Sequence, residues 1–168
     1  MNDAEARLYA DLAALRIAYD VHEHAPVFTV EESGKHTHHL KGAHTKNLFL
    51  KDKAGKFWLV TVPDNARVDL KALPAAIGCG RVSFGKGEDM ERLLGITPGS
   101  VTALAAINDM DDSVRFVLDA ELAAADVINC HPLRNSATLG LSPDDLVRAL
   151  THWRHPPLIT PVPQLEPA

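Results

Sequence analysis

Residues 44–52, His-Thr-Lys-Asn-Leu-Phe-Leu-Lys-Asp, decide the fold of this chain, because an apolar, aromatic run begins directly after a cation and a carboxamide. A second such run, residues 56–62, follows the short segment Lys53-Ala54-Gly55. Two apolar runs joined by a glycine-containing connection are typical of a β-hairpin. We therefore expect strands over 47–52 and 56–62, with Lys46 and Asn47 where the first strand opens.

Further elements are predicted on both sides of this hairpin from apolar spacing and from capping residues. Helices are expected over 4–17, from Thr29 to a stop at Gly34, over 69–77 and 88–94, and after the Ser142 cap, with Leu146, Val147, Leu150 and Trp153 as its buried face. Strands are expected over 20–24, 81–84, 101–107, 114–118, 127–129 and 136–141, and a His-rich surface loop over 34–45. This irregular alternation favours an α+β fold, a mixed sheet flanked by helices, over a doubly wound parallel sheet.

The chain has 168 residues, of which 46% are hydrophobic and 23% are charged, which fits one ordinary globular domain. We expect that domain over residues 1–155, followed by a proline-rich tail, residues 156–168, that is extended or disordered. The chain contains no apolar run of eighteen residues, and its first residues lack the layout of a secretion signal. We therefore expect a cytoplasmic protein without a membrane partner, with Cys79 and Cys130 as reduced thiols.

The formal net charge of -5 argues against non-specific coating of nucleic acid, since that affinity comes from many Lys and Arg contacts to phosphate. Any contact with RNA must be local, and DNA is not an expected partner.

Two motifs elsewhere join the Lys46 segment as candidates for chemistry. Gly95-Ile96-Thr97-Pro98-Gly99 lies between a predicted helix and a predicted strand, and by itself it is most simply a turn. The other motif is Asn129-Cys130-His131-Pro132-Leu133-Arg134-Asn135, in which a single histidine is more often structural than catalytic. Cys130 and His131 are unsuited to a nucleophile pair, because neighbours on a strand face opposite ways, so Cys130 is better read as a small buried hydrophobe.

Residues His36, His38, His39 and His44 form the densest histidine cluster. Their spacing lacks the helical pair with a nearby acid that is typical of a zinc hydrolase, so a solvated loop is the better reading and no metal is expected. The glycines at 78–80 and 85–87 match no nucleotide-binding motif, so no cofactor is expected either.

Taken together, the three motifs resemble those of the YbaK-like aminoacyl-tRNA deacylases, most closely the ProX-type prolyl-tRNA editing proteins. The resemblance runs from about Leu8 to about Leu150 and implies the family's mixed, partly barrel-like sheet with helices around it. It also implies roles for individual residues. Lys46 would hold the terminal nucleotide of the tRNA, Asn47 would orient the aminoacyl group, and His131, with Phe28 and Val30, would line the aminoacyl pocket.

The resemblance places the glycine- and proline-containing loop, with Gly95, Pro98 and Gly99, beside the scissile ester. Backbone N–H groups there can stabilise an oxyanion without an ionisable side chain. Lys46 and Asn47 are neighbours on a strand, so both can line one pocket only if the regular strand starts after Lys46 or is bulged.

The expected activity is hydrolysis of mischarged alanyl-tRNA(Pro), with the tRNA(Pro) acceptor end as partner and prolyl-tRNA synthetase as a further candidate partner. Two alternatives stay open: deacylation of cysteinyl-tRNA(Pro), and a catalytically silent tRNA-binding module.

Overall fold

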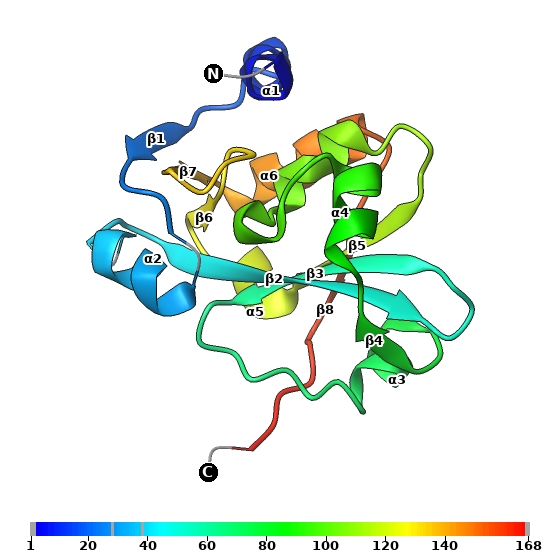
Figure 1. The fold of residues 1–168 in the computed structure, drawn as a ribbon. Helices are drawn as coiled ribbons and strands as arrows, with labels where there is room; N and C mark the ends of the chain where they lie inside the picture. The colour runs from blue at the N-terminus through cyan, green and yellow to red at the C-terminus, as the bar shows by residue number, and fades with distance from the viewer. Residues whose placement is uncertain (1–2, 28, 38, 167–168) are drawn as a thin grey trace.

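The computed structural model describes residues 3–27, 29–37 and 39–166, and the predicted hairpin lies at its centre (Figure 1). Strands β2 (Ala43–Asp52) and β3 (Phe57–Pro63) pair antiparallel in unbroken register from Thr45 opposite Pro63 to Lys51 opposite Phe57. The carboxylate of Asp52 closes the hairpin by accepting hydrogen bonds from the Lys56 backbone N–H at 3.0 Å and from the Trp58 indole N–H at 3.0 Å. The hairpin is confirmed, but β2 begins before Lys46.

Eight strands form one sheet around this hairpin. The other strands are β1 (Asp20–Glu23), β4 (Val82–Phe84), β5 (Val114–Asp119), β6 (Ile128–Cys130), β7 (Ala137–Leu141) and β8 (Leu158–Thr160). The order is β1-β7-β6-β2-β3-β5-β8, and β4 pairs with β2. The β2/β6, β3/β5 and β5/β8 pairs are parallel and the others antiparallel, so the predicted mixed sheet and α+β class are confirmed.

Helices flank this sheet. They are α1 (Asp3–Ala14), α2 (Val30–Thr37), α3 (Leu73–Ile77), α4 (Gly87–Leu94), α5 (Ala120–Ala123) and α6 (Pro143–His152), with short 3-10 helices η1 (Pro98–Ser100) and η2 (Ala103–Asn108). Ser142 caps α6 by accepting a hydrogen bond from the Asp145 N–H, as predicted. In the part of the chain that the structure describes, no helix is both long enough and apolar enough to cross a bilayer.

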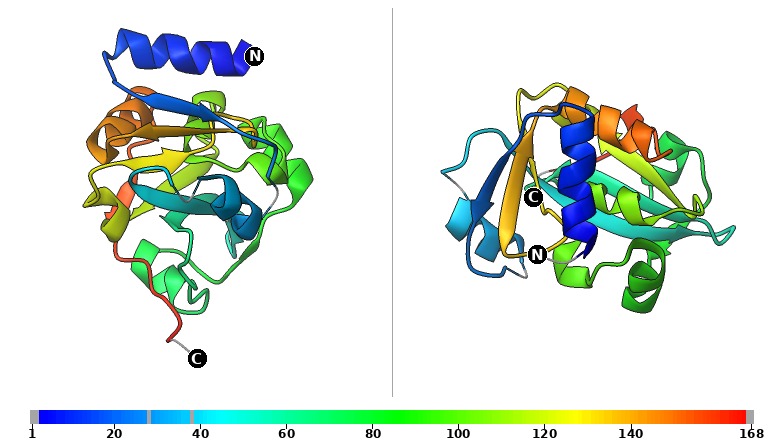
Figure 2. Two further views of the ribbon diagram at one scale, coloured as in Figure 1. Left: turned by 90° about the vertical axis from the view of Figure 1, so that its left-hand side faces the viewer. Right: turned by 90° about the horizontal axis from the view of Figure 1, so that it is seen from above.

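The alternation of side chains along β2 and β3 divides the interior into two cores. On one face Phe49 and Leu59 pack with α1, α4, η2 and α6. On the other face Leu50, Trp58 and Val60 pack with α3 and with Val162 of the tail. Helix α1 and the tail lie at opposite ends of the molecule (Figure 2), so the central hairpin supports both cores.

Two predicted elements are wrong. The expected strand over 101–107 is instead η2, capped by the Thr102 hydroxyl, which accepts a hydrogen bond from the Leu104 N–H. Residues 103–107 are all buried, and a short, fully apolar run cannot be assigned to strand or helix from periodicity. Gly34 does not end α2, which continues to Thr37, and β2 already starts at Ala43, so the expected loop over 34–45 is short.

Other elements differ only in detail. Helix α1 ends at Ala14, before the predicted end at residue 17. Helix α3 starts at Leu73, later than the predicted Asp69. The proline-rich tail is extended where it forms β8, and Val162 beyond it is buried.

Candidate functional site

A cavity of about 190 Å³ lies against one edge of β2. Along this edge β2 pairs with β6 at residues 43–44 and with β4 at residues 50–52. Between these two ladders, no strand among the described residues pairs with that edge. The cavity occupies this gap and is lined by His44, Thr45, Lys46 and Asn47 in succession.

The open edge explains how adjacent residues of a regular strand line one cavity. The unbroken register excludes both a bulge and a late strand start at Lys46. Because the Asp64 N–H donates to the His44 carbonyl at 3.0 Å, the main-chain groups of His44 point toward β3. By alternation, the main-chain groups of Asn47 point the other way, toward the edge that lies between the ladders with β6 and β4.

The carboxamide of Asn47 is held at both ends by the protein. Its Nδ2 donates to the Val101 carbonyl at 3.2 Å, and its Oδ1 accepts from the Thr61 hydroxyl at 2.6 Å. Asn47 therefore ties β2 to the chain that directly follows the glycine- and proline-containing loop.

That loop, residues 95–99, reaches the cavity through Pro98 and Gly99. Gly95 is not among the lining residues. It ends α4 at a φ of 65° and lies against Asn108. Asn108 donates from Nδ2 to the Leu94 carbonyl at 2.9 Å. The two carboxamides, Asn108 and Asn47, thus hold the loop at its two ends.

Histidine 131 lines the cavity as a neutral ring. Burial lowers the pKa of His131, and the hydrogen bond to Ala137 offsets this only in part. Its Nδ1 lies 3.2 Å from the Ala137 carbonyl oxygen, which can only accept a hydrogen bond. Nδ1 is therefore the donor, and Nε2 keeps a lone pair.

Cys130 also lines the cavity, but burial raises the pKa of its thiol to about 12. The thiolate is the nucleophilic form of cysteine, so this side chain is unsuited to attack at neutral pH. The reading of Cys130 as a small buried hydrophobe is confirmed, since it is 4% exposed.

The loop that carries His131 is fastened to the far wall of the cavity. Asn135 and Val27 exchange two hydrogen bonds, from the Val27 N–H to the Asn135 carbonyl at 3.1 Å and from Asn135 Nδ2 to the Val27 carbonyl at 2.8 Å. Next to them, Arg134 bridges the buried carboxylate of Glu5 in α1 and the exposed carboxylate of Glu23 in β1. These contacts fix Val27, which lines the cavity, relative to His131.

Two predicted pocket residues are not placed by these observations. Phe28 lies outside the described residues, and so does the side chain of Val30, although Val30 begins α2. Conversely, sequence reasoning missed His44 and Asp64, which also line the cavity. Counting outward from the predicted turn would have found the pair, because the hairpin register sets residue 44 opposite residue 64.

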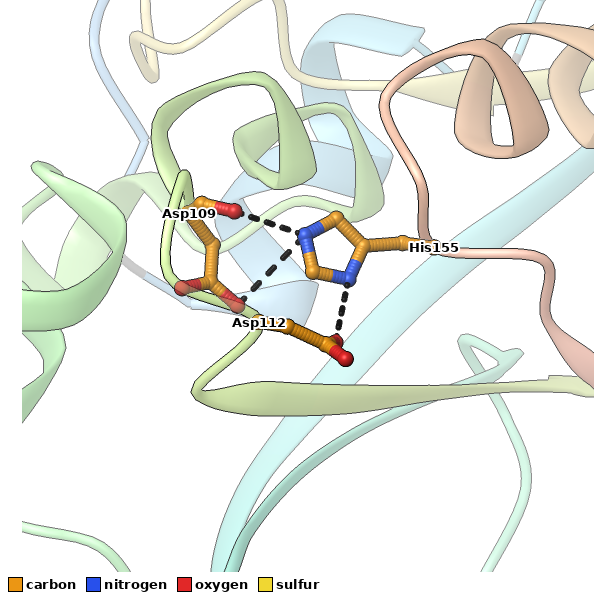
Figure 3. A group of neighbouring side chains, drawn as sticks. All are labelled: Asp109, Asp112 and His155. Atoms are coloured by element: carbon orange, nitrogen blue, oxygen red, sulfur yellow. Dashed lines mark hydrogen bonds and ion pairs between the residues drawn. The ribbon is translucent and has the colours of Figure 1, made fainter.

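Asp109, Asp112 and His155 form a compact group away from this cavity, and they are the candidate metal ligands among the described residues (Figure 3). His155 Nε2 lies 2.8 Å from the Asp109 carbonyl oxygen, which makes Nε2 a hydrogen-bond donor. The Asp109 carboxylate accepts hydrogen bonds from the Ser113 and Val114 N–H groups. Only His155 Nδ1 and Asp112, 3.4 Å apart, remain uncommitted, which is fewer than the three protein ligands of a zinc site. The group is better suited to fastening the end of α6 to the turn before β5.

A groove of about 410 Å³, separate from this cavity, lies farther along the hairpin, where β2 pairs with β4. Its lining includes the exposed cations Lys51, Lys53 and Arg81. The one carboxylate in its lining, Asp52, is already engaged by Lys56 and Trp58. This groove is therefore locally cationic in a chain whose net charge is -5.

Known proteins resemble this chain over most of its length. Residues 24–149 match the family model described as "Aminoacyl-tRNA editing domain". The chain is 42% identical over 162 residues to the prolyl-tRNA synthetase associated domain-containing protein 1 of Bos taurus, covering 94% of each protein. It is 36% identical over 145 residues to the prolyl-tRNA editing protein ProX of Acetoanaerobium sticklandii, covering 86% of this chain and 88% of that one.

The fold also matches the crystal structure of a candidate trans-editing enzyme for prolyl tRNA synthetase. The TM-score is 0.74 at 18% identity, and the match covers 98% of this chain and 99% of that chain. With a family model matching most of its residues and relatives well above 30% identity, this chain belongs to the family of aminoacyl-tRNA editing domains.

Proposed function

We propose that this chain hydrolyses the ester of alanyl-tRNA(Pro), releasing alanine and intact tRNA. The observation that carries the proposal is the convergence of Lys46, Asn47, Pro98, Gly99 and His131 on one small cavity. Its volume of about 190 Å³ lies below the ~300–1,000 Å³ of drug-sized ligand pockets. A space of this size suits a small aminoacyl group better than a whole nucleotide.

The need for such an activity follows from the limits of binding selectivity. A synthetic site shaped for proline excludes a smaller amino acid weakly, because a missing methylene changes binding by only ~1–3 kcal/mol. A second site that admits only small residues corrects the error. Val27 and His131, fixed to one another by the Asn135 contacts, are the described walls against which a proline ring would collide.

The proposed mechanism uses water and no side-chain nucleophile. Lys46 anchors the 3′ end of the tRNA, where an ammonium on a flexible stem suits a phosphate. Water attacks the carbonyl carbon, the bond to the ribose oxygen breaks, and that oxygen leaves with a proton. A ribose hydroxyl of the substrate assists the proton transfer.

The oxyanion requires donors that are not already used. Within the loop, the Gly95 N–H donates to Glu91, the Ser100 N–H donates to Thr97, and Pro98 has no N–H. Gly99, which lines the cavity, is therefore the loop residue best suited to donate its backbone N–H to the oxyanion. Asn47 has a structural task at the same place, since it holds Val101 just beyond this loop.

The cationic groove around Lys51, Lys53 and Arg81 supports a tRNA substrate, because its positive charges can attract phosphates. Lys51 lies on β2, the strand that also carries Lys46. The cations are local, as a net charge of -5 requires.

The decisive experiment measures release of labelled amino acid from tRNA(Pro) charged separately with alanine, cysteine or proline. Rapid loss of alanine with proline spared is the expected result. Preferential loss of cysteine would move the assignment to cysteinyl-tRNA(Pro), and loss of none at high protein concentration would favour a binding module.

A further inference from the structure

The charged side chains of the cavity are few and of opposite sign. Among its described lining residues, Lys46 is the one lysine or arginine, and Asp64 is the one carboxylate. Asp64 directly follows β3 and lies opposite His44, to whose carbonyl its N–H donates at 3.0 Å. It stands on the hairpin two residues beyond Val62, the partner of Lys46.

The carboxylate of Asp64 has no structural task within residues 3–27, 29–37 and 39–166, where it makes no hydrogen bond or ion pair. Other carboxylates at element ends in this chain are used. Asp52 accepts from Lys56 and Trp58, and Asp119 accepts from the Glu121 and Val162 N–H groups. An aspartate in a turn commonly accepts such a bond from its own backbone. Asp64 instead presents a half-buried acceptor to the cavity.

We propose that Asp64 binds the free α-ammonium group of the aminoacyl ester, an inference that rests on the function proposed above. An ammonium group offers donors only and a carboxylate accepts only, so the two are complementary. Diagonal neighbours on a hairpin face have Cα atoms ~7–8 Å apart, so one ligand can span Lys46 and Asp64. The phosphate end of the substrate would meet the lysine and its amine would meet the aspartate.

This arrangement makes the site selective for esters of amino acids with a free amine. Acylation of the amine removes its charge and two of its three N–H donors. Asp64 then faces a neutral, bulkier group. Peptidyl and N-acylated aminoacyl esters should therefore be poor ligands, independently of the side chain that the pocket admits. Asp64 is thus a specificity-determining residue whose effect is separate from that of the walls around the side chain.

The test uses the full chain and a stable analogue, adenosine carrying alanine in amide linkage at the 3′ position, with its N-acetylated form as the comparison. Calorimetry gives the affinity for both. The wild-type chain should bind the free amine roughly 10- to 100-fold more tightly, the range of one charge-assisted hydrogen bond. Asp64→Asn should abolish this preference, and Asp64→Glu should restore part of it. Asp111→Asn is the matched control, because it removes the same charge from an exposed turn outside the cavity.

The outcomes separate the two proposals. Equal preference for the free amine in wild type and Asp64→Asn, with unchanged melting temperatures, would overturn the inference, as would a wild-type chain that binds both analogues equally. Amine-selective binding that depends on Asp64 without hydrolysis of any charged tRNA would support it and would instead refute the hydrolytic function.

Discussion

The two ends of strand β2 have the same partner on one side and different environments on the other. At the hairpin end, residues 50–52 are paired with β3 and with β4, so both edges are satisfied. At the cavity end, residues 45–47 are paired with β3 but lie beyond the short ladder with β6. One strand therefore has a fully paired end and an end with an open edge, because β4 and β6 cover only parts of it. Substitutions at the cavity end should alter activity, and substitutions at the hairpin end should alter stability.

The largest effect is expected at the cavity end. Lys46→Ala should lower kcat/KM for alanyl-tRNA(Pro) by about 100-fold, since a hydrogen bond to a charged group contributes ~1.5–3 kcal/mol and the substrate is polyanionic. The melting temperature should change little. Lys56→Ala is the control, because Lys56 is an exposed cation of the same hairpin that lines neither the cavity nor the cationic groove. Unfolding of Lys46→Ala would contradict the assignment of this lysine to the substrate.

At the closed end the expected effect is on stability. A Cβ on Gly85 would lie 2.4 Å from a ring carbon of Phe49, which is buried in the larger core. Gly85→Ala should lower the free energy of unfolding by ~1–3 kcal/mol, the usual cost of overpacking. Chemical denaturation measures this. Gly55→Ser, in the turn of the same hairpin, separates steric from conformational cost, because a Cβ there meets no atom within 4 Å but φ is 86°.

A smaller effect is expected from a residue that touches the loop without lining the cavity. Asn108→Asp replaces the donor to the Leu94 carbonyl with an acceptor and should release the end of the 95–99 loop. We expect kcat to fall about tenfold, ~1.4 kcal/mol in the barrier, with KM nearly unchanged. Single-turnover hydrolysis separates the two constants. Arg7→Ala, which removes the other partner of the Asn108 side chain, should leave kcat intact. A rise in KM alone would show that the loop serves binding.

The smallest effect concerns Asp52. Burial would raise the pKa of this carboxyl, but hydrogen bonds from the Trp58 indole and from the Lys56 and Ala54 backbone outweigh burial and lower it. A lowered folded-state pKa adds stability above the unfolded-state pKa of 3.8, and this stability is lost as the pH falls through the folded-state value. Asp52→Asn should cost about 1 kcal/mol at pH 7, and the difference from wild type should shrink below about pH 4. A constant difference across pH would refute this account.

The central hairpin and the caps of α4 and α6 were predictable because they depend on local signals. Gly95 favours a left-handed helix end, and Ser142 is three residues from the N–H that it caps. Helix η2 was not predictable, because its buried alanines carry no periodicity and the surrounding helices decide its conformation. The arrangement of residues around the cavity likewise depends on tertiary packing.

Lys46, Asn47 and His131 were identified through family motifs, and all three line the cavity. The position of Asp64 opposite His44 is predictable from the register of the hairpin. Its place in a cavity depends on the gap between β6 and β4, which lie far apart in the sequence. The hydrogen bond from Asn47 to Val101 joins residues 54 positions apart. Long-range pairing of this kind leaves no local signal.

The open edge of β2 limits which substitutions its cavity end tolerates. The main-chain groups of Asn47 lie at this edge whatever side chain residue 47 carries, so most substitutions leave them in place. Proline is the exception, because it removes the N–H itself. A deep mutational scan through residues 45–48 should therefore show that proline is not tolerated at any of them, even at positions where many other substitutions are.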